Sequence, residues 1–286
     1  MSRRHLLVAA VAVAVLCLTL TGSSAAPSSG GTVRVSGAWA LYPMVVKWAE
    51  VYRASHPGVR IDLSAGGAGK GAADALGGLV DIGMVSRAIH PDEIKKGGWY
   101  VPVATDAVFP TINSKNPYVT KIYAKGLKRS ILKAIWEKRI TNWGQVIPGA
   151  NAPLHVYTRS DACGAAETWA AYLGGKQENL KGTAVYGDPG VAEAVRRDPY
   201  GIGFNNLNYC YDARTGKPVS GLFIAPIDIN GDGKITRNEH FYSSISTLLK
   251  AVGACAYPSP PARALNLLCN CKPKGANASF IKLVLT

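Results

Sequence analysis

Hydrophobic and polar positions along the chain alternate between the period of a strand and the period of a helix. In the first third, short apolar runs at 32–35, 59–63 and 81–84 predict strands. Helical patterns separate them, and the clearest one places five apolar side chains on one face: Leu41, Val45, Trp48, Ala49 and Tyr52. This β-loop-α-β alternation predicts a parallel sheet whose loops gather at one edge.

The middle of the chain repeats the alternation. Strands are predicted at 106–113, 155–158 and 201–204, and the last of them is expected to return to the first half of the sheet. Helices follow, and Asp161 is the predicted N-cap of one of them. Two α/β lobes with a ligand between them are therefore expected. The last residues, 280–286, have a helical pattern that stops without a cap, so we expect the chain to be truncated.

The beginning of the chain has the pattern of an export signal. Two arginines precede an apolar run at 6–20, and small and polar residues follow at 21–26. We expect a signal peptide at 1–26, of the general secretory or the twin-arginine type. The alternatives are an uncleaved anchor and lipidation at Cys17, which follows a poor lipobox. Each places the protein outside the cytoplasm, in a periplasm or at the outer face of the cell membrane.

The composition is that of a folded and basic protein. The 286 residues are 48% hydrophobic and 17% charged, which excludes an intrinsically disordered chain. Removing the two arginines of the export signal changes the formal net charge from +14 to +12. The excess of positive charge is spread along the sequence, so it favours attraction of small anions over nucleic-acid binding.

Five cysteines follow the export signal: Cys163, Cys210, Cys255, Cys269 and Cys271. An odd number in an oxidising compartment predicts up to two disulfides and one free thiol. The most economical pairing joins Cys255 to Cys269 or to Cys271. The last two are too isolated for a zinc site, because no second pair of Cys or His accompanies them.

Three predicted strand-to-helix loops, at 37–40, 66–70 and 161–165, each present a helix N-terminus lined with small residues. The unpaired N–H groups and the positive dipole end of such a terminus attract anions. Two arginines can add bidentate contacts to an oxyanion: Arg159, just before the third loop, and Arg87, after the strand at 81–84. The alternative role of Arg159 is an ion pair with a neighbouring aspartate, and both roles can hold together.

Four segments, at 36–43, 80–87, 140–143 and 159–164, appear in an order that resembles the phosphate-binding subunit of phosphate ABC importers, a class II periplasmic-type binding protein. The resemblance covers residues 31–286. It implies a two-lobed, periplasmic binding protein-like (class II) α/β fold with two crossover strands. It also implies a protein without enzymatic activity, a membrane permease as the partner, and a monomer that binds no nucleic acid.

The lobe boundaries follow from the two expected crossovers. Lobe I then comprises 31–112 and 206–286, and lobe II comprises 113–205, with hinges near 112 and 205. An oxyanion, phosphate first, would be captured in the cleft between the lobes, which close over it.

The loops and the resemblance together give the predicted ligand site. Its members are Ala38, Trp39, Ala40, Ala68, Gly69, Lys70, Ser86, Arg87, Arg159, Asp161, Cys163, Gly164 and Ala165. Several positions where the family has hydroxyl donors hold alanine here, and alanine can neither donate nor accept. Ser86 stands where the family has a carboxylate that accepts a proton from phosphate. We therefore expect weaker binding or altered selectivity, with sulfate, molybdate or tungstate as alternative ligands, unless Lys70 and Arg87 compensate.

A separate motif at 228–239 matches the calcium-binding loop pattern D-x-[DN]-x-[DN]-G-x5-E. The expected oxygen ligands of a structural Ca²⁺ are Asp228, Asn230, Asp232, Glu239 and the carbonyl of Lys234. The flanking segment at 222–227 has a strand pattern in place of the usual entering helix. The alternative is a polar turn without an ion.

Two other function classes remain open. A hydrolase would use Cys163, whose thiol pKa should fall at a helix N-terminus, with His155 as its base. An exported module that binds polyanions through Ca²⁺ and positive charge would present a shallow basic face in place of an interlobe cleft.

Overall fold

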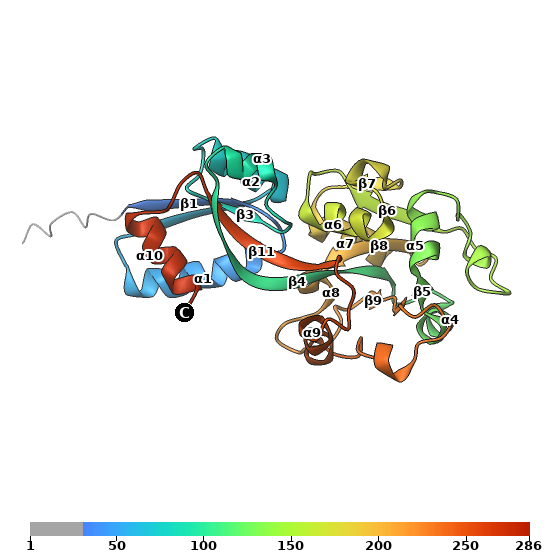
Figure 1. Ribbon diagram of the computed structural model, residues 1–286. Coiled ribbons are helices and arrows are strands. Elements are labelled where there is room, and N and C mark those ends of the chain that lie inside the picture. The colour runs from blue at the N-terminus through green and yellow to red at the C-terminus, as the bar shows by residue number, and fades with distance from the viewer. Residues whose placement is uncertain (1–30) are drawn as a thin grey trace, which may run out of the picture.

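The computed structural model describes residues 31–286 as two α/β lobes joined by long strands (Figure 1). The predicted signal peptide lies outside these residues. The first lobe contains β1 (Thr32–Gly37), α1 (Tyr42–Ser55), β2 (Arg60–Ala65), α2 (Ala68–Leu76), β3 (Ile82–Val85), α3 (Pro91–Lys95) and α10 (Gly275–Val284). Pro43 occupies the first turn of α1, where its missing N–H costs no hydrogen bond.

The second lobe is built from the middle of the chain. Its elements are α4 (Val119–Lys125), β5 (Leu127–Lys128), α5 (Arg129–Trp136), β6 (His155–Arg159), α6 (Gly164–Leu173), β7 (Thr183–Val185), α7 (Gly187–Arg197), β8 (Gly201–Asn206), α8 (Leu207–Cys210), β9 (Leu222–Ile224), β10 (Ile227–Asp228) and α9 (Ile245–Gly253). Among residues 31–286, no helix combines the length and the apolar character needed to cross a membrane.

Two strands connect the lobes: β4 (Trp99–Asn113) and β11 (Ala262–Cys269). They pair with each other in antiparallel fashion, and the order of the continuous sheet is β2-β1-β3-β11-β4-β8-β6-β7. The first part of β4 pairs with β11, whereas its last part pairs with β8. The predicted fold class, a two-lobed α/β protein with two crossover strands, is confirmed.

The two apolar cores show where the chain passes between the lobes. One core joins residues between 33 and 85 to residues between 265 and 281. The other extends from 107 to 262 and includes α8 and α9. The segment 207–257, which the sequence assigns to lobe I, therefore shares its core with the second lobe. The crossover expected near 205 is wrong, because β8 pairs with β6 inside the second lobe and β11 makes the return.

The predicted disulfide from Cys255 to Cys269 or Cys271 is also wrong, since all five cysteines of the described chain are free. Strand β11 separates them. It carries Cys269 into the first lobe, while Cys255 follows α9 in the second lobe. Because a strand advances about 3.3 Å per residue, the eight residues of β11 hold Cys255 and Cys269 much too far apart for an S–S bond.

Candidate functional site

The predicted anion-binding loops meet where the two lobes touch. The amide of Gly69, in the first turn of α2, donates to the carbonyl of Ala162 at 3.1 Å. A Cβ atom on Gly164, the first residue of α6, would lie 2.2 Å from the carbonyl oxygen of Ser86. Only glycine permits this approach of the two lobes. The structure thus brings the second and third loops together across the interface.

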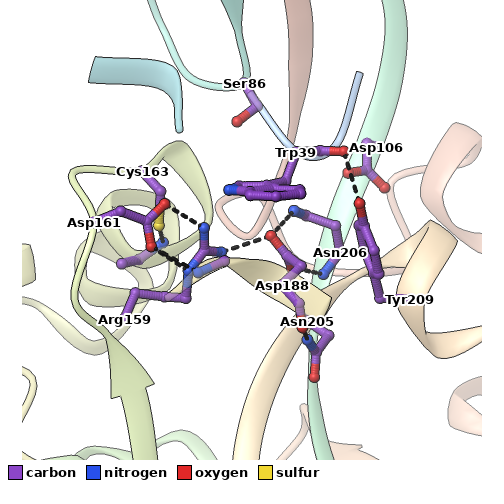
Figure 2. A network of polar contacts seen from close by, with 12 residues as sticks. Trp39, Ser86, Asp106, Arg159, Asp161, Cys163, Asp188, Asn205, Asn206 and Tyr209 are labelled. Atoms are coloured by element: carbon purple, nitrogen blue, oxygen red, sulfur yellow. Dashed lines mark hydrogen bonds and ion pairs between the residues drawn. The ribbon is translucent and has the colours of Figure 1, made fainter. Parts of the chain in front are cut away.

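Arg159 lies at the base of this interface, at the end of β6, within a network of polar side chains (Figure 2). Its guanidinium donates to Asp161 at 2.8 and 2.6 Å and to Asp188 at 2.6 Å. Asp188 in turn accepts the backbone amide and the side-chain amide of Asn206, each at 2.9 Å. Burial alone would lower the pKa of Arg159, but the two carboxylates raise it above its usual value. The guanidinium is therefore charged and held rigidly.

Trp39 fills the part of the interface above this network (Figure 2). Its ring packs on Gly187, whose φ of +72° and lack of a Cβ atom let the indole approach the backbone. The ring also meets Tyr186 edge-on, at 5.9 Å between centroids. The indole Nε1 is buried and has no hydrogen-bond partner among residues 31–286. It is a donor that a ligand with acceptor oxygens can satisfy.

The other predicted site residues of the first lobe lie around these contacts. Ala38, Ala40 and Ala68 are buried, and Ser86 has only 3% of its surface exposed. Lys70 is half-exposed and forms an ion pair with Asp74 one turn further along α2. On the second lobe, Gly164 and Ala165 form the buried first turn of α6.

Arg87 is also paired, and one of its two ion pairs crosses the lobe interface. It binds Glu93 within the first lobe at 2.6 and 2.9 Å, and Glu167 of α6 at 3.1 Å. His90 contacts the same Glu167 at 3.0 Å. Arg87, His90 and Glu167 line a pocket of about 450 Å³ at the edge of the interface, together with Cys163. Arg87 thus acts as a contact between lobes.

Several residues of the network were not predicted from the sequence: Asp106, Asp188, Asn205, Asn206, Tyr209 and Arg263. Asp188 follows Gly187, the first residue of α7. The turn into this helix is similar to the three loops that the sequence predicts to bind an anion. Asp106 is a charged residue within a buried stretch of β4, which is a signal for function. Arg263 was missed because β11 was not predicted.

Cys163 is a helix cap, and the hydrolase interpretation fails. The N-cap of α6 is Cys163, not the predicted Asp161, and its Sγ accepts the amide of Ala166 at 3.4 Å. Burial raises the pKa of the thiol to about 12, the opposite of the predicted fall. His155 lies at the other end of β6, where it pairs with Asp198 at 2.7 Å. The base and the thiol are therefore not in contact.

The loop at 228–239 is closed by its own carboxylates. Asp228 accepts the amides of Gly231 and Gly233, and Glu239 accepts three backbone amides and the hydroxyl of Thr236. The remaining predicted ligands are exposed: Asn230, Asp232 and Lys234. Within residues 31–286, no three His, Cys, Asp or Glu side chains gather as they would around a metal ion. The calcium site stays a prediction.

Comparison with known sequences gives one family and several curated relatives. A sequence model of the PBP superfamily domain matches residues 22–258. The phosphate-binding protein PstS of Methanocaldococcus jannaschii is 26% identical, over 79% of this chain and 69% of its own length. The PstS protein of Xylella fastidiosa (strain Temecula1) is 28% identical, over 65% of this chain and 57% of its own length. The chain thus spans 57% to 69% of the lengths of these relatives.

Solved structures show the same fold. A protein from Clostridium perfringens, assigned as a phosphate ABC transporter substrate-binding protein and holding phosphate, has a TM-score of 0.72 at 22% identity. The match covers 89% of this chain and 93% of that one. An ABC-type phosphate transport receptor from Vibrio cholerae has a TM-score of 0.62 at 18% identity, with the same coverage of both chains.

Proposed function

The chain belongs to the PBP superfamily, and on that premise we propose that it captures an inorganic oxyanion, most of all phosphate, for an ABC importer. The resemblance to the phosphate-binding subunit of such importers is confirmed by the curated relatives, which are phosphate-binding proteins and not enzymes. Export across the membrane, delivery to a permease and a monomeric state belong to the same proposal.

One observation carries the proposal: residues from both lobes and from both crossover strands converge on one buried polar network. Arg159 comes from β6, Asp188 from α7 and Arg263 from β11, and Arg263 reaches the carbonyl of Ser86 in the first lobe at 3.0 Å. A ligand held by such a network contacts both lobes at once, so its binding is coupled to their closure.

The unsatisfied donors of the interface favour a ligand that carries acceptor oxygens, as an oxyanion does. Trp39 Nε1 and Arg263 Nη1 are buried donors without a hydrogen-bond partner in the described part of the chain, although Nη1 lies 3.2 Å from Asp106 Oδ2 in an ion pair. A small ligand with two or more acceptor oxygens can accept hydrogen bonds from the indole N–H of Trp39 and from the guanidinium N–H of Arg263. The first turns of α2 and α6, which meet at this interface, add their helix dipoles.

Calorimetric titration of the purified protein against phosphate, arsenate, sulfate, molybdate and tungstate tests this function. We expect saturable binding of phosphate with one site per chain. The matched control is Arg34→Gln, which removes an arginine that pairs with Asp81 on the surface of the first lobe. It should bind phosphate as the wild type does. Absence of binding for all five anions would refute the proposal.

A further inference from the structure

A pocket of about 560 Å³ lies in the second lobe, and none of the residues that line it belongs to the polar network around Arg159. It is enclosed by α5, by the C-terminal end of α6 and by the segment 176–181. Gly174 ends α6 in the left-handed conformation, with a φ of +81° that glycine adopts without strain. The segment then returns to α5, where the amide of Lys181 donates to the carbonyl of Trp136 at 2.7 Å. A turn and a backbone hydrogen bond thus define the walls of the pocket.

Positive charge dominates the lining of this pocket, which we call the basic pocket. Four basic side chains and two carboxylates line it: Lys133, Arg139, Lys176 and Lys181, with Glu137 and Glu178. The pKa of Glu137 is lowered first by its hydrogen bond to Arg139, and then by the charges of Arg139, Lys133 and Lys181. Three cations therefore surround one carboxylate, and the four cations exceed the two carboxylates by two charges.

The two lysines of the segment 176–181 are available to a ligand. Lys176 and Lys181 are exposed, and no carboxylate of residues 31–286 forms an ion pair with either of them. A concave surface lined by charges of one sign concentrates small ions of the opposite sign. The chemistry of the basic pocket thus suits a small anion.

The basic pocket adjoins the pocket at the edge of the lobe interface. The two pockets share lining residues within the segment 175–178. In this segment the side chain of Gln177 donates to the carbonyl of Asp161 at 2.7 Å and accepts the amide of Cys163 at 3.2 Å. The segment that carries Lys176 is therefore bonded directly to the third anion-binding loop.

The charges between the basic pocket and the interface leave this route open to an anion. Glu167 lines the pocket at the edge of the interface, but Arg87 and His90 contact its carboxylate at 3.1 and 3.0 Å. Gly69, from the second anion-binding loop, lines the same pocket. An anion that leaves the basic pocket past Lys176 thus reaches the loops of the interlobe site.

We propose, resting on the oxyanion function above, that the basic pocket is a second, weak site for inorganic oxyanions, which collects the ligand and speeds its entry into the interlobe site. Exposed charges bind weakly because water and salt screen them, so the basic pocket releases its anion readily. Its effect belongs to the rate of association. The rate of dissociation is set by the interlobe site, whose network these lysines do not join.

The test is the rate of phosphate association with wild type and with the double variant Lys176→Gln, Lys181→Gln. Stopped-flow tryptophan fluorescence measures it, since Trp39 lies at the interface. At low salt we expect the association rate constant to fall about threefold to tenfold, and the dissociation rate to stay unchanged. Near 1 M salt, where the Debye length is about 3 Å, the two proteins should associate with phosphate equally fast.

Two further variants separate a local site from net charge. Glu178→Gln removes a carboxylate of the basic pocket and should speed association. The matched control is Lys115→Gln with Lys121→Gln, which removes two positive charges from exposed residues of the second lobe that line neither pocket. It should leave the association rate constant within about twofold of wild type. Equal slowing by this control would assign the effect to net charge and overturn the inference.

Occupancy of the basic pocket is measured directly by backbone amide signals. After phosphate has saturated the interlobe site, further phosphate should shift the signals of 176–181 in wild type but not in the lysine double variant. Unshifted signals, or unchanged association in the double variant, would overturn the inference and leave the oxyanion function intact. Shifts at 176–181 without any binding at the interlobe site would refute the oxyanion function, and the capture role with it.

Discussion

Arg159 and Asp188 form an ion pair with an Nη1–Oδ2 distance of 2.6 Å, and both side chains are 0% exposed. The pair joins the end of β6 to the first turn of α7, and Asp188 also orients Asn206 at the end of β8. Three segments of the second lobe are thus fixed relative to one another. The second-lobe half of the site is organised by the protein's own charges, independently of any ligand.

Substitution of Arg159 should affect both stability and binding. Arg159→Ala leaves Asp161 and Asp188 buried without their cation, and we expect the free energy of unfolding to fall by about 3–5 kcal/mol. Phosphate affinity should fall as well, because the site loses its central positive charge. Urea unfolding and calorimetry measure the two effects.

The control for Arg159→Ala restores the charge balance. Adding Asp188→Asn removes one uncompensated carboxylate but retains a side-chain oxygen for the amide of Asn206. The double variant should recover part of the stability and none of the phosphate affinity. Full affinity in a folded Arg159→Ala protein would show that the ligand binds elsewhere.

Glu167 should slow the opening of the closed lobes. It lies on α6 of the second lobe and contacts Arg87 and His90 of the first lobe at 3.1 and 3.0 Å. Glu167→Gln should therefore speed the release of phosphate by up to about fivefold, the range for a partly exposed ion pair. Stopped-flow displacement measures the rate. The control is Glu193→Gln, whose carboxylate pairs only with Arg196 and Arg197 of its own helix among the described residues.

The cysteines should differ strongly in their reaction with a thiol reagent at neutral pH. Cys255 and Cys271 are exposed and should react in the native protein. Burial raises the pKa of the Cys163 and Cys269 thiols to about 12, so these thiols should react only after unfolding. Mass spectrometry after timed labelling identifies the modified residues. Rapid native labelling of Cys163 would contradict its buried position at the N-cap of α6.

Calcium at the 228–239 loop is tested by chelation. If the ion binds the native protein alone, a hundredfold excess over Kd stabilises it by about 2.7 kcal/mol. A chelator should then lower the melting temperature and leave phosphate affinity nearly unchanged, because the carboxylates of Asp228 and Glu239 accept hydrogen bonds only from their own loop among the described residues. Asp228→Ala with Glu239→Ala should abolish the response to added Ca²⁺. An unchanged melting temperature in the presence of chelator would contradict the calcium prediction, and the loop would then be a turn held by its hydrogen bonds alone.

Most elements of the first lobe could be predicted because they have a strong local period. The helix at Tyr42–Ser55 and the strands around it follow from apolar spacing and from Pro43. Strand β11 could not be predicted, since Ala262–Cys269 mixes polar and apolar residues that are buried by pairing with two distant strands. The wrong lobe boundary and the missed Arg263 both follow from this omission.

The candidate site was predictable only where its chemistry is local in sequence. Arg159 and Asp161 are two residues apart, and their ion pair was foreseen. Asp188 and Asp106 reach the same network from α7 and β4, and only the tertiary structure brings them together. The loss of hydroxyl donors could be predicted from the alanines in the loops. A buried donor without a partner, such as Trp39 Nε1, could not be predicted, because burial depends on the tertiary structure.

The central claim is that phosphate binds between the lobes, and the indole signal of Trp39 tests it most directly. With ¹⁵N-labelled tryptophan, the indole N–H signals are observed during a phosphate titration, and Trp39→Phe assigns the one at the interface. We predict a saturable shift of the Trp39 signal, because its Nε1–H is buried at the interface and free to donate to the ligand. The signals of Trp136 and Trp143, buried in the second-lobe core, should stay in place. A titration that leaves the Trp39 signal unmoved would contradict the account.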